Sequence, residues 1–178
     1  MKKVCTILFI ATLALSGCKK NDSPKLFGTD TINNTLYGTG PYYALGFSFT
    51  SAKQLSTLHS PAPDITIEAD IAVDGSIRKI FFSSGNFDNS FYLFGTYSNV
   101  TDATQAFKSL TSFMDPQWNA IGDAVAANQV WLFKTSGGRY VKIRVISTVE
   151  ENRNSTPYAE TSFEWVYQPD GSLTFPGK

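Results

Sequence analysis

The C-terminal segment 130–175 has the most regular pattern in the chain. Runs of β-branched and aromatic residues alternate there with short stretches rich in Gly, Pro, Asp and Ser. This is the arrangement of strands joined by tight turns. We predict two strand–turn–strand units, which pair 130–134 with 139–148 and 161–167 with 172–175. Units of this kind constrain the chain to an antiparallel sheet.

Further strands are predicted upstream of this segment. In chain order they are 42–51, 65–73, 76–82 and 90–97. The dipeptide Asp74-Gly75 predicts a hairpin turn between the second and third of them. The segments 52–63 and 150–154 contain prolines or consecutive charged residues, and we expect both to be loops.

The periodicity changes at residue 101. Between 101 and 114, apolar residues recur at three- and four-residue intervals, which is the pattern of one face of an α-helix. Thr101 or Asp102 is suited to cap its start, and Asp115-Pro116 is suited to end its first part. A weaker helical spacing continues to Ala127. We therefore predict one amphipathic helical insertion over about 101–127.

Length and composition fit one β-rich domain. The chain has 178 residues, of which 14% are aromatic and 17% are charged. This length suits a single domain with its own core, and such a composition is typical of a folded protein rather than a disordered one. The predicted fold class is mainly β, an antiparallel sheet or sandwich-like single domain with the helical insertion.

The N-terminus has the three parts of a bacterial lipoprotein signal peptide. A basic start, Met1-Lys2-Lys3, precedes a short apolar run, and Leu15-Ser16-Gly17-Cys18 fits a lipobox. The apolar run is shorter than the roughly 20 residues that a membrane-spanning helix needs. We therefore expect a signal peptide at 1–17 and a covalent lipid on Cys18.

The segment after Cys18 is polar and shows no periodicity. We predict that residues 18–34 form the lipid anchor and tether, and that 35–178 form the β domain. The acyl chains would hold the protein on a membrane. Lys19 favours sorting to the outer membrane, where we expect exposure at the cell surface; a periplasm-facing position is the alternative.

Charge and motif content favour binding over catalysis. Fifteen basic and fifteen acidic residues cancel, so no long-range field would recruit nucleic acid. The motifs G-x-S-x-G, H-E-x-x-H, C-x-x-C and the P-loop do not occur. We predict a binding protein and not an enzyme.

Aromatic side chains are the most abundant chemical resource of this chain. Neighbouring residues on a strand point to opposite faces, so the aromatic run at 90–97 cannot place all its rings in one core. Packing accounts for most rings, and the others are free to line a cleft for a planar apolar ligand or a sugar. The candidates for such a cleft are Phe82, Tyr92, Phe94 and Tyr97.

Motifs in the stretches 130–144, 163–175 and 42–51 resemble those of the HmuY family, the haem-binding surface lipoproteins (haemophores) of Gram-negative anaerobes. The stretch VWLFKTSGGRYVKIR at 130–144 is similar to that family's V-y-v-v-k-t-a-d-G-k-Y-a-K-i segment. The stretch FEWVYQPDGSLTF at 163–175 is similar to its closing f-x-Y-x-Y-Q-x-D-G-s hairpin, and 42–51 is similar to its early Y-Y-x-x-S-F strand. The family's D-W-D-I-A-F strand has no tryptophan counterpart; 64–67 and 70–73 are its nearest matches.

The resemblance implies an HmuY-like β domain at 35–178. In that family an apolar cleft holds haem, which is then passed to an outer-membrane receptor. His59 and Met114 are the candidate ligands to a haem iron, because no other histidine occurs and the remaining methionine is Met1. The alternatives are an exposed, non-ligating role for His59 and core packing for Met114.

Two functions therefore stay open. The first is capture of haem or porphyrin for uptake, with no metal expected apart from a haem iron. The second is a non-haem surface lipoprotein with a structural, adhesive or carbohydrate-binding role.

Overall fold

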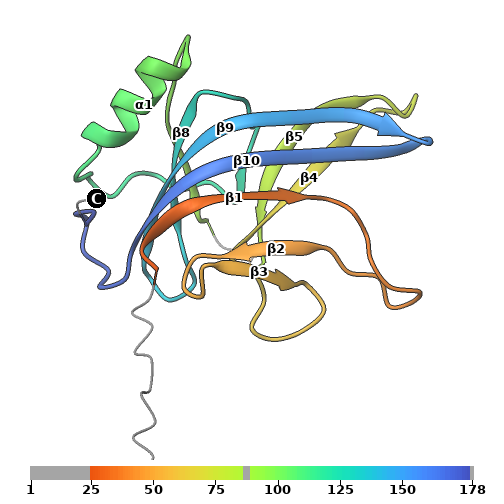
Figure 1. Cartoon of the computed structure of the whole chain (residues 1–178), viewed down its shortest axis with the longest axis horizontal. Helices are drawn as coiled ribbons and strands as arrows, with labels where there is room; N and C mark the ends of the chain where they lie inside the picture. The colour runs from red at the N-terminus through yellow and green to blue at the C-terminus, as the bar shows by residue number, and fades with distance from the viewer. Residues whose placement is uncertain (1–24, 86–88, 177–178) are drawn as a thin grey trace, which may run out of the picture.

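The structure is a computed structural model that describes residues 25–85 and 89–176. In these residues two antiparallel sheets pack face to face, and one helix covers the outer side of one sheet (Figure 1). The prediction of a mainly β, sandwich-like domain with one helix is confirmed. The predicted signal peptide at 1–17 and the lipid on Cys18 lie outside the described residues.

The first sheet has the strand order β1-β10-β9-β8-β6. Its strands are β1 (Phe27–Asn33), β6 (Phe91–Thr96), β8 (Gln129–Lys134), β9 (Tyr140–Arg153) and β10 (Thr156–Gln168). The second sheet has the order β3-β2-β4-β5-β7. Its strands are β2 (Leu45–Ser48), β3 (Lys53–Ser56), β4 (Ile65–Ile71), β5 (Ile77–Ser84) and β7 (Ile121–Gly122). The pairings of β8 with β9 and of β4 with β5 confirm two predicted hairpins.

The main core lies between the two sheets and is built largely from aromatic rings. The ring centroid of Phe47 lies 5.5 Å from those of Phe163 and Trp165, and Phe82 stacks on Phe91 at 6.2 Å. Each ring removes about 150–250 Å² from water. Because these contacts join residues of both sheets, they hold the sandwich together.

The hairpin of β9 and β10 is longer than the sequence predicts. Glu150 lies opposite Ala159, and Arg153 lies opposite Thr156, so the expectation of a loop at 150–154 is wrong. The turn is Asn154-Ser155, with φ of 52° and 64°, which is the backbone of a two-residue type I′ hairpin. The end of this ribbon is solvated, which explains its charged, loop-like composition.

The second predicted C-terminal hairpin is also wrong. The turn near Asp170 forms, because the Asp170 carboxylate accepts a 2.7 Å hydrogen bond from the Ser172 amide. The segment 172–175 then crosses to 111–113, where the Phe175 amide donates to the Thr111 carbonyl at 2.8 Å. It cannot join β10, because β9 and β1 occupy both edges of that strand.

Two edge strands lie in segments predicted to be irregular. Strand β1, within the predicted tether 18–34, pairs with β10 from Phe27 opposite Val166 to Asn33 opposite Glu160. The β domain therefore begins before residue 35. Strand β3 likewise lies within the predicted loop 52–63. Both strands are at the edges of their sheets, where few side chains are buried and the apolar pattern is weak.

The helix α1 (Val100–Ser109) covers the part of the predicted insertion with the strongest periodicity. Its N-cap is Asn99, whose side chain accepts a 2.9 Å bond from the Asp102 amide, and not Thr101 or Asp102. Phe107 and Leu110 pack on the outer face of the first sheet. The Lys142 ammonium donates to the Phe107 and Leu110 carbonyls, at 2.8 Å each, and so caps the helix end.

The second part of the predicted insertion is not helical. Gly122 lies opposite Phe82 in the β5–β7 ladder, and the Val125 amide donates to the Ile80 carbonyl at 2.9 Å. A Cβ on Gly122 would lie 3.0 Å from the Cβ of Phe82, so this approach favours glycine. The spacing of Trp118, Ile121 and Val125 matches that of a helix only by coincidence. Val125 is buried, but the segment that contains it is not helical.

Lys142→Met tests the importance of the cap on α1. The substitution keeps the aliphatic stem but leaves two buried carbonyls without their charged donor, and we expect it to lower the free energy of unfolding by about 2 kcal/mol. Urea unfolding measures this change. The matched control is Lys53→Met on the exposed edge strand β3, which should stay within about 0.5 kcal/mol of the unsubstituted protein. Equal effects of the two substitutions would contradict the capping role.

Candidate functional site

The two candidate haem ligands lie in different layers of the sandwich. His59 is exposed in the loop that follows β3 of the second sheet. Met114 follows α1 on the outer side of the first sheet, and 89% of its surface is exposed. The described structure does not bring the imidazole and the thioether together on one cleft. The alternative of core packing for Met114 is wrong, because its side chain lies outside the core.

The four aromatic cleft candidates do not form one surface. Phe82 is fully buried between the sheets, against Phe91 and Trp131. Tyr92 and Tyr97 pack against the cluster under α1, whereas Phe94 is exposed at the irregular part of β6. The register of β6 shifts between Leu93 and Gly95, which changes the faces to which the later side chains point.

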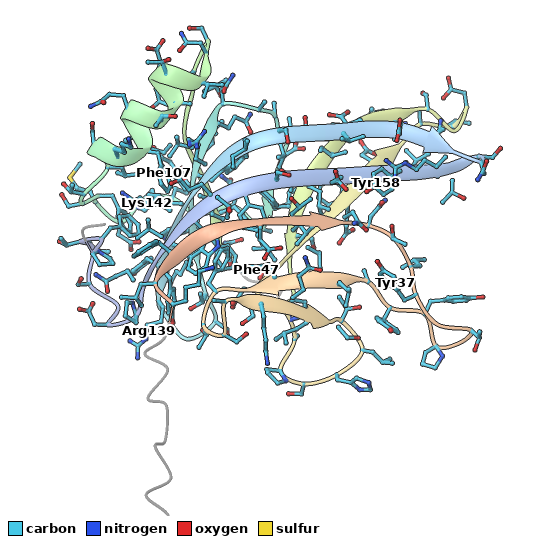
Figure 2. All side chains as sticks on the ribbon, in the orientation of Figure 1. Tyr37, Phe47, Phe107, Arg139, Lys142 and Tyr158 are labelled. Carbon is cyan, nitrogen blue, oxygen red and sulfur yellow. The ribbon has the colours of Figure 1, made fainter. Side chains whose placement is uncertain are left out.

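A different aromatic group gathers at the opposite end of the sandwich from α1. Residues 37–43, which we call the tyrosine hairpin, join β1 to β2 and contain Tyr37, Tyr42 and Tyr43. Tyr37 and Tyr43 exchange two backbone hydrogen bonds, of 2.8 and 3.1 Å, and their rings stack at 5.8 Å. Tyr42 is 67% exposed. Tyr37 lies at the end of the molecule opposite Phe107 and Lys142 (Figure 2).

Three adjoining hollows border the tyrosine hairpin, and we call them together the tyrosine groove. They have volumes of about 430, 350 and 220 Å³. Asn34 and Leu36 line both the first and the second hollow, and Thr57, Thr66 and Glu68 line both the second and the third. These shared residues place the three hollows next to one another. Tyr42 and Tyr43 form part of the wall of the middle one.

Local hydrogen bonds hold the groove in place. Two hydrogen bonds join the Asn34 side chain to β10. Its amide nitrogen donates to the Pro157 carbonyl at 3.1 Å, and its amide oxygen accepts from the Ala159 backbone amide at 2.9 Å. Gly38 has a φ of 90°, and a Cβ there would lie 2.9 Å from the Pro41 carbonyl oxygen. A side chain at this position would therefore be strained. The tyrosines thus project from an ordered turn.

The first hollow ends at a charged aromatic cluster near the tip of the β9–β10 hairpin. The Arg153 guanidinium lies 3.3 Å from the centre of the Tyr158 ring and is paired with Glu151 at 2.6 Å. The Tyr158 hydroxyl donates to the Glu160 carboxylate. Burial raises the pKa of Tyr158 above its ordinary value, and the hydrogen bond to Glu160 raises it further. This phenol therefore stays protonated at neutral pH.

The third hollow is bordered by Pro63, which precedes the part-buried Asp64. The Asp64 carboxylate accepts a 2.8 Å bond from the Phe49 amide, which joins the start of β4 to the turn after β2. Burial raises the pKa of Asp64 above its usual value, although hydrogen bonds from Phe49, Ser48 and Thr50 oppose the shift. Asp64 thus supports the wall of the groove at an electrostatic cost.

The chemistry of the groove is that of a binding surface. Its middle and third hollows combine hydroxyls, the Asn34 amide and the Glu68 carboxylate with apolar side chains, among them Leu36, Ile67 and Pro63. In the described ranges 25–85 and 89–176, no three His, Cys, Asp or Glu residues cluster so that they could hold a metal ion. The helix of the described part is too short and too polar to cross a membrane.

Sequence reasoning missed this site because it assigned the tyrosines to a strand. The alternation of Leu45, Phe47 and Phe49 predicts a strand over 42–51. The observed strand β2 begins only at Leu45. The missed indication is the local composition. Two glycines and a proline lie between Tyr37 and Tyr42, and this is typical of a turn that displays its aromatic residues.

No protein-family model matches this chain, and no curated protein matches it either. The resemblance to the HmuY family therefore remains a prediction from the quoted residues.

Asp64→Asn tests the electrostatic cost at the groove wall. Because the pKa of Asp64 is raised in the folded state, the folded protein holds this proton more tightly than the unfolded chain. The stability that Asp64 contributes at low pH is therefore lost as the pH rises above about 3.8 and through the pKa of Asp64 in the folded protein. We expect the stability of Asp64→Asn relative to the unsubstituted protein to increase between about pH 3 and about pH 7, as measured by urea unfolding.

Asp74→Asn is the matched control, with the opposite sign. Hydrogen bonds from Ser76 lower the pKa of Asp74 in the folded protein. The stability that Asp74 contributes is therefore present above its pKa in the unfolded chain, and it is lost as the pH falls through its pKa in the folded protein. The stability of Asp74→Asn relative to the unsubstituted protein should therefore decrease between the same two pH values. The same trend with pH in both variants would contradict the environment described for Asp64.

Proposed function

We propose that this protein is a lipid-anchored surface module that binds a non-haem ligand in the tyrosine groove. The observation that carries the proposal is the ordered display of Tyr42 and of the stacked pair Tyr37–Tyr43 beside adjoining hollows. Exposed aromatic rings on a rigid turn, next to a few placed polar groups, are typical of ligand sites. The module acts by binding and not by catalysis.

The position of the groove relative to the expected lipid supports this role. Six residues lie between Cys18 and Lys25, so seven steps of at most about 3.6 Å each join the two, or about 25 Å in an extended chain. A lipid on Cys18 would keep the start of β1 close to the membrane. The seven residues of β1 carry the chain about 20 Å toward the tyrosine hairpin (Figure 1). The groove is then presented away from the lipid surface.

The positions of His59 and Met114 favour a non-haem ligand. A six-coordinate haem iron needs two axial ligands on opposite sides of one flat cleft. Here the two candidates that carry an imidazole or a thioether, His59 and Met114, lie in different layers and are both exposed. The middle hollow of the groove is also lined by Glu68, whose negative charge would repel the propionates of haem.

A haemin titration distinguishes the two functions left open by the sequence. We expect the full-length protein in liposomes to leave the Soret band of haemin unchanged in both oxidation states, or to shift it equally with and without His59→Ala and Met114→Ala. Absorption spectroscopy measures the shift. A Soret shift that either substitution abolishes would overturn the proposal and favour haem capture.

A further inference from the structure

We infer that the tyrosine groove binds a neutral oligosaccharide. This inference rests on the proposed function and specifies the ligand class of the same site. Three properties of the groove support it: exposed rings, a polar lining, and the sign of its charge.

The exposed rings suit the apolar face of a sugar. The ring of Tyr42 is 67% exposed, and Leu36 beside it is 65% exposed. A pyranose presents a flat face of C–H groups that packs on an aromatic ring, while its hydroxyls remain free to make hydrogen bonds. A phenol has the matching character, with an apolar body and a polar tip. Tyr37 stacks on Tyr43, which lines the same hollow as Tyr42.

The polar lining suits the hydroxyls of the same sugar. Sugar hydroxyls both donate and accept hydrogen bonds, so a site for them needs both kinds of partner. The hydroxyls of Thr57 and Thr66 supply both, and the exposed carboxylate of Glu68 supplies two acceptor oxygens. Within the described part of the chain, Glu68 makes one long contact, of 3.5 Å with Thr66. Its oxygens are therefore available to bind a pair of adjacent hydroxyls.

The charge of the lining favours a neutral ligand. Among the described residues that line the middle and third hollows, Glu68 is the charged one, and none is a Lys or Arg. The cation of the first hollow, Arg153, is already paired with Glu151 and stacked on Tyr158. An anionic ligand would meet an unpaired carboxylate without a compensating cation, which is costly when water is displaced.

The adjoining positions of the three hollows favour several sugar units over one. The three volumes of about 430, 350 and 220 Å³ share lining residues. A chain of sugars can follow this path from Pro63 at one end to Tyr158 at the other. A flat protein partner would instead contact Tyr42 and leave the concave lining unused.

Glycan binding by the full-length protein in liposomes tests the inference. The probes are neutral gluco-, manno-, xylo- and galacto-oligosaccharides, oligogalacturonate as an acidic glycan, and haemin. We expect at least one neutral oligosaccharide to bind and Tyr42→Ala to weaken it about tenfold or more, because it removes the stacking ring. Tyr42→Phe, which keeps the ring, should stay within about threefold. Calorimetry measures each affinity.

The controls separate failure of the inference from failure of the proposed function. Phe94→Ala removes an exposed ring far from the groove and should leave affinity unchanged, whereas Glu68→Gln should weaken binding several-fold. Oligogalacturonate binding that Tyr42→Ala abolishes would overturn the neutral-glycan inference and leave the proposed function in place. Haemin binding that Tyr42→Ala abolishes would overturn both. Binding that Tyr42→Ala does not change would overturn both. Absence of binding to every probe would overturn the inference.

Discussion

The ribbon formed by β9 and β10 is the constraint on which the rest of the structure depends. Its inner face carries Phe163 and Trp165 into the core against Phe47 of the second sheet. Its outer face carries Lys142, which ends α1 by binding two of its last carbonyls. Its tip carries Arg153 and lines the first hollow of the tyrosine groove. One hairpin therefore positions the core, the helix and one end of the site.

The two ends of this ribbon are stabilised in different ways. Near α1, both faces are covered, and aromatic rings and a buried ammonium contribute stability. At the tip, residues 150–153 are exposed and are ordered by the backbone ladder and the Asn154-Ser155 turn. Surface that is not needed for the core is free to serve binding. The tyrosine hairpin follows Asn34, which is bound to the same ribbon, and this is where we propose that ligand binds.

The fold class, the β8–β9 and β4–β5 hairpins and the position of α1 could be predicted from the sequence, because burial produces clear periodicity in these elements. The missed features lack such a pattern. Edge strand β1 buries chiefly Ile32, and the long hairpin turns at Asn154-Ser155 without the glycine that usually marks such a turn. The candidate site was missed for a related reason. Tyr42 and Phe47 both resemble strand residues in sequence, and only the path of the chain shows that one is displayed and the other buried.

The central claim is that ligand enters the tyrosine groove and leaves the opposite end of the sandwich unchanged. Amide chemical shifts of the isotopically labelled protein test this claim most directly when a bound oligosaccharide is titrated in. We expect chemical-shift changes confined to the groove, at Leu36, Tyr42, Thr57, Glu68 and their neighbours. Shifts centred on His59, or on Met114 and α1, with the tyrosine hairpin unchanged, would contradict it.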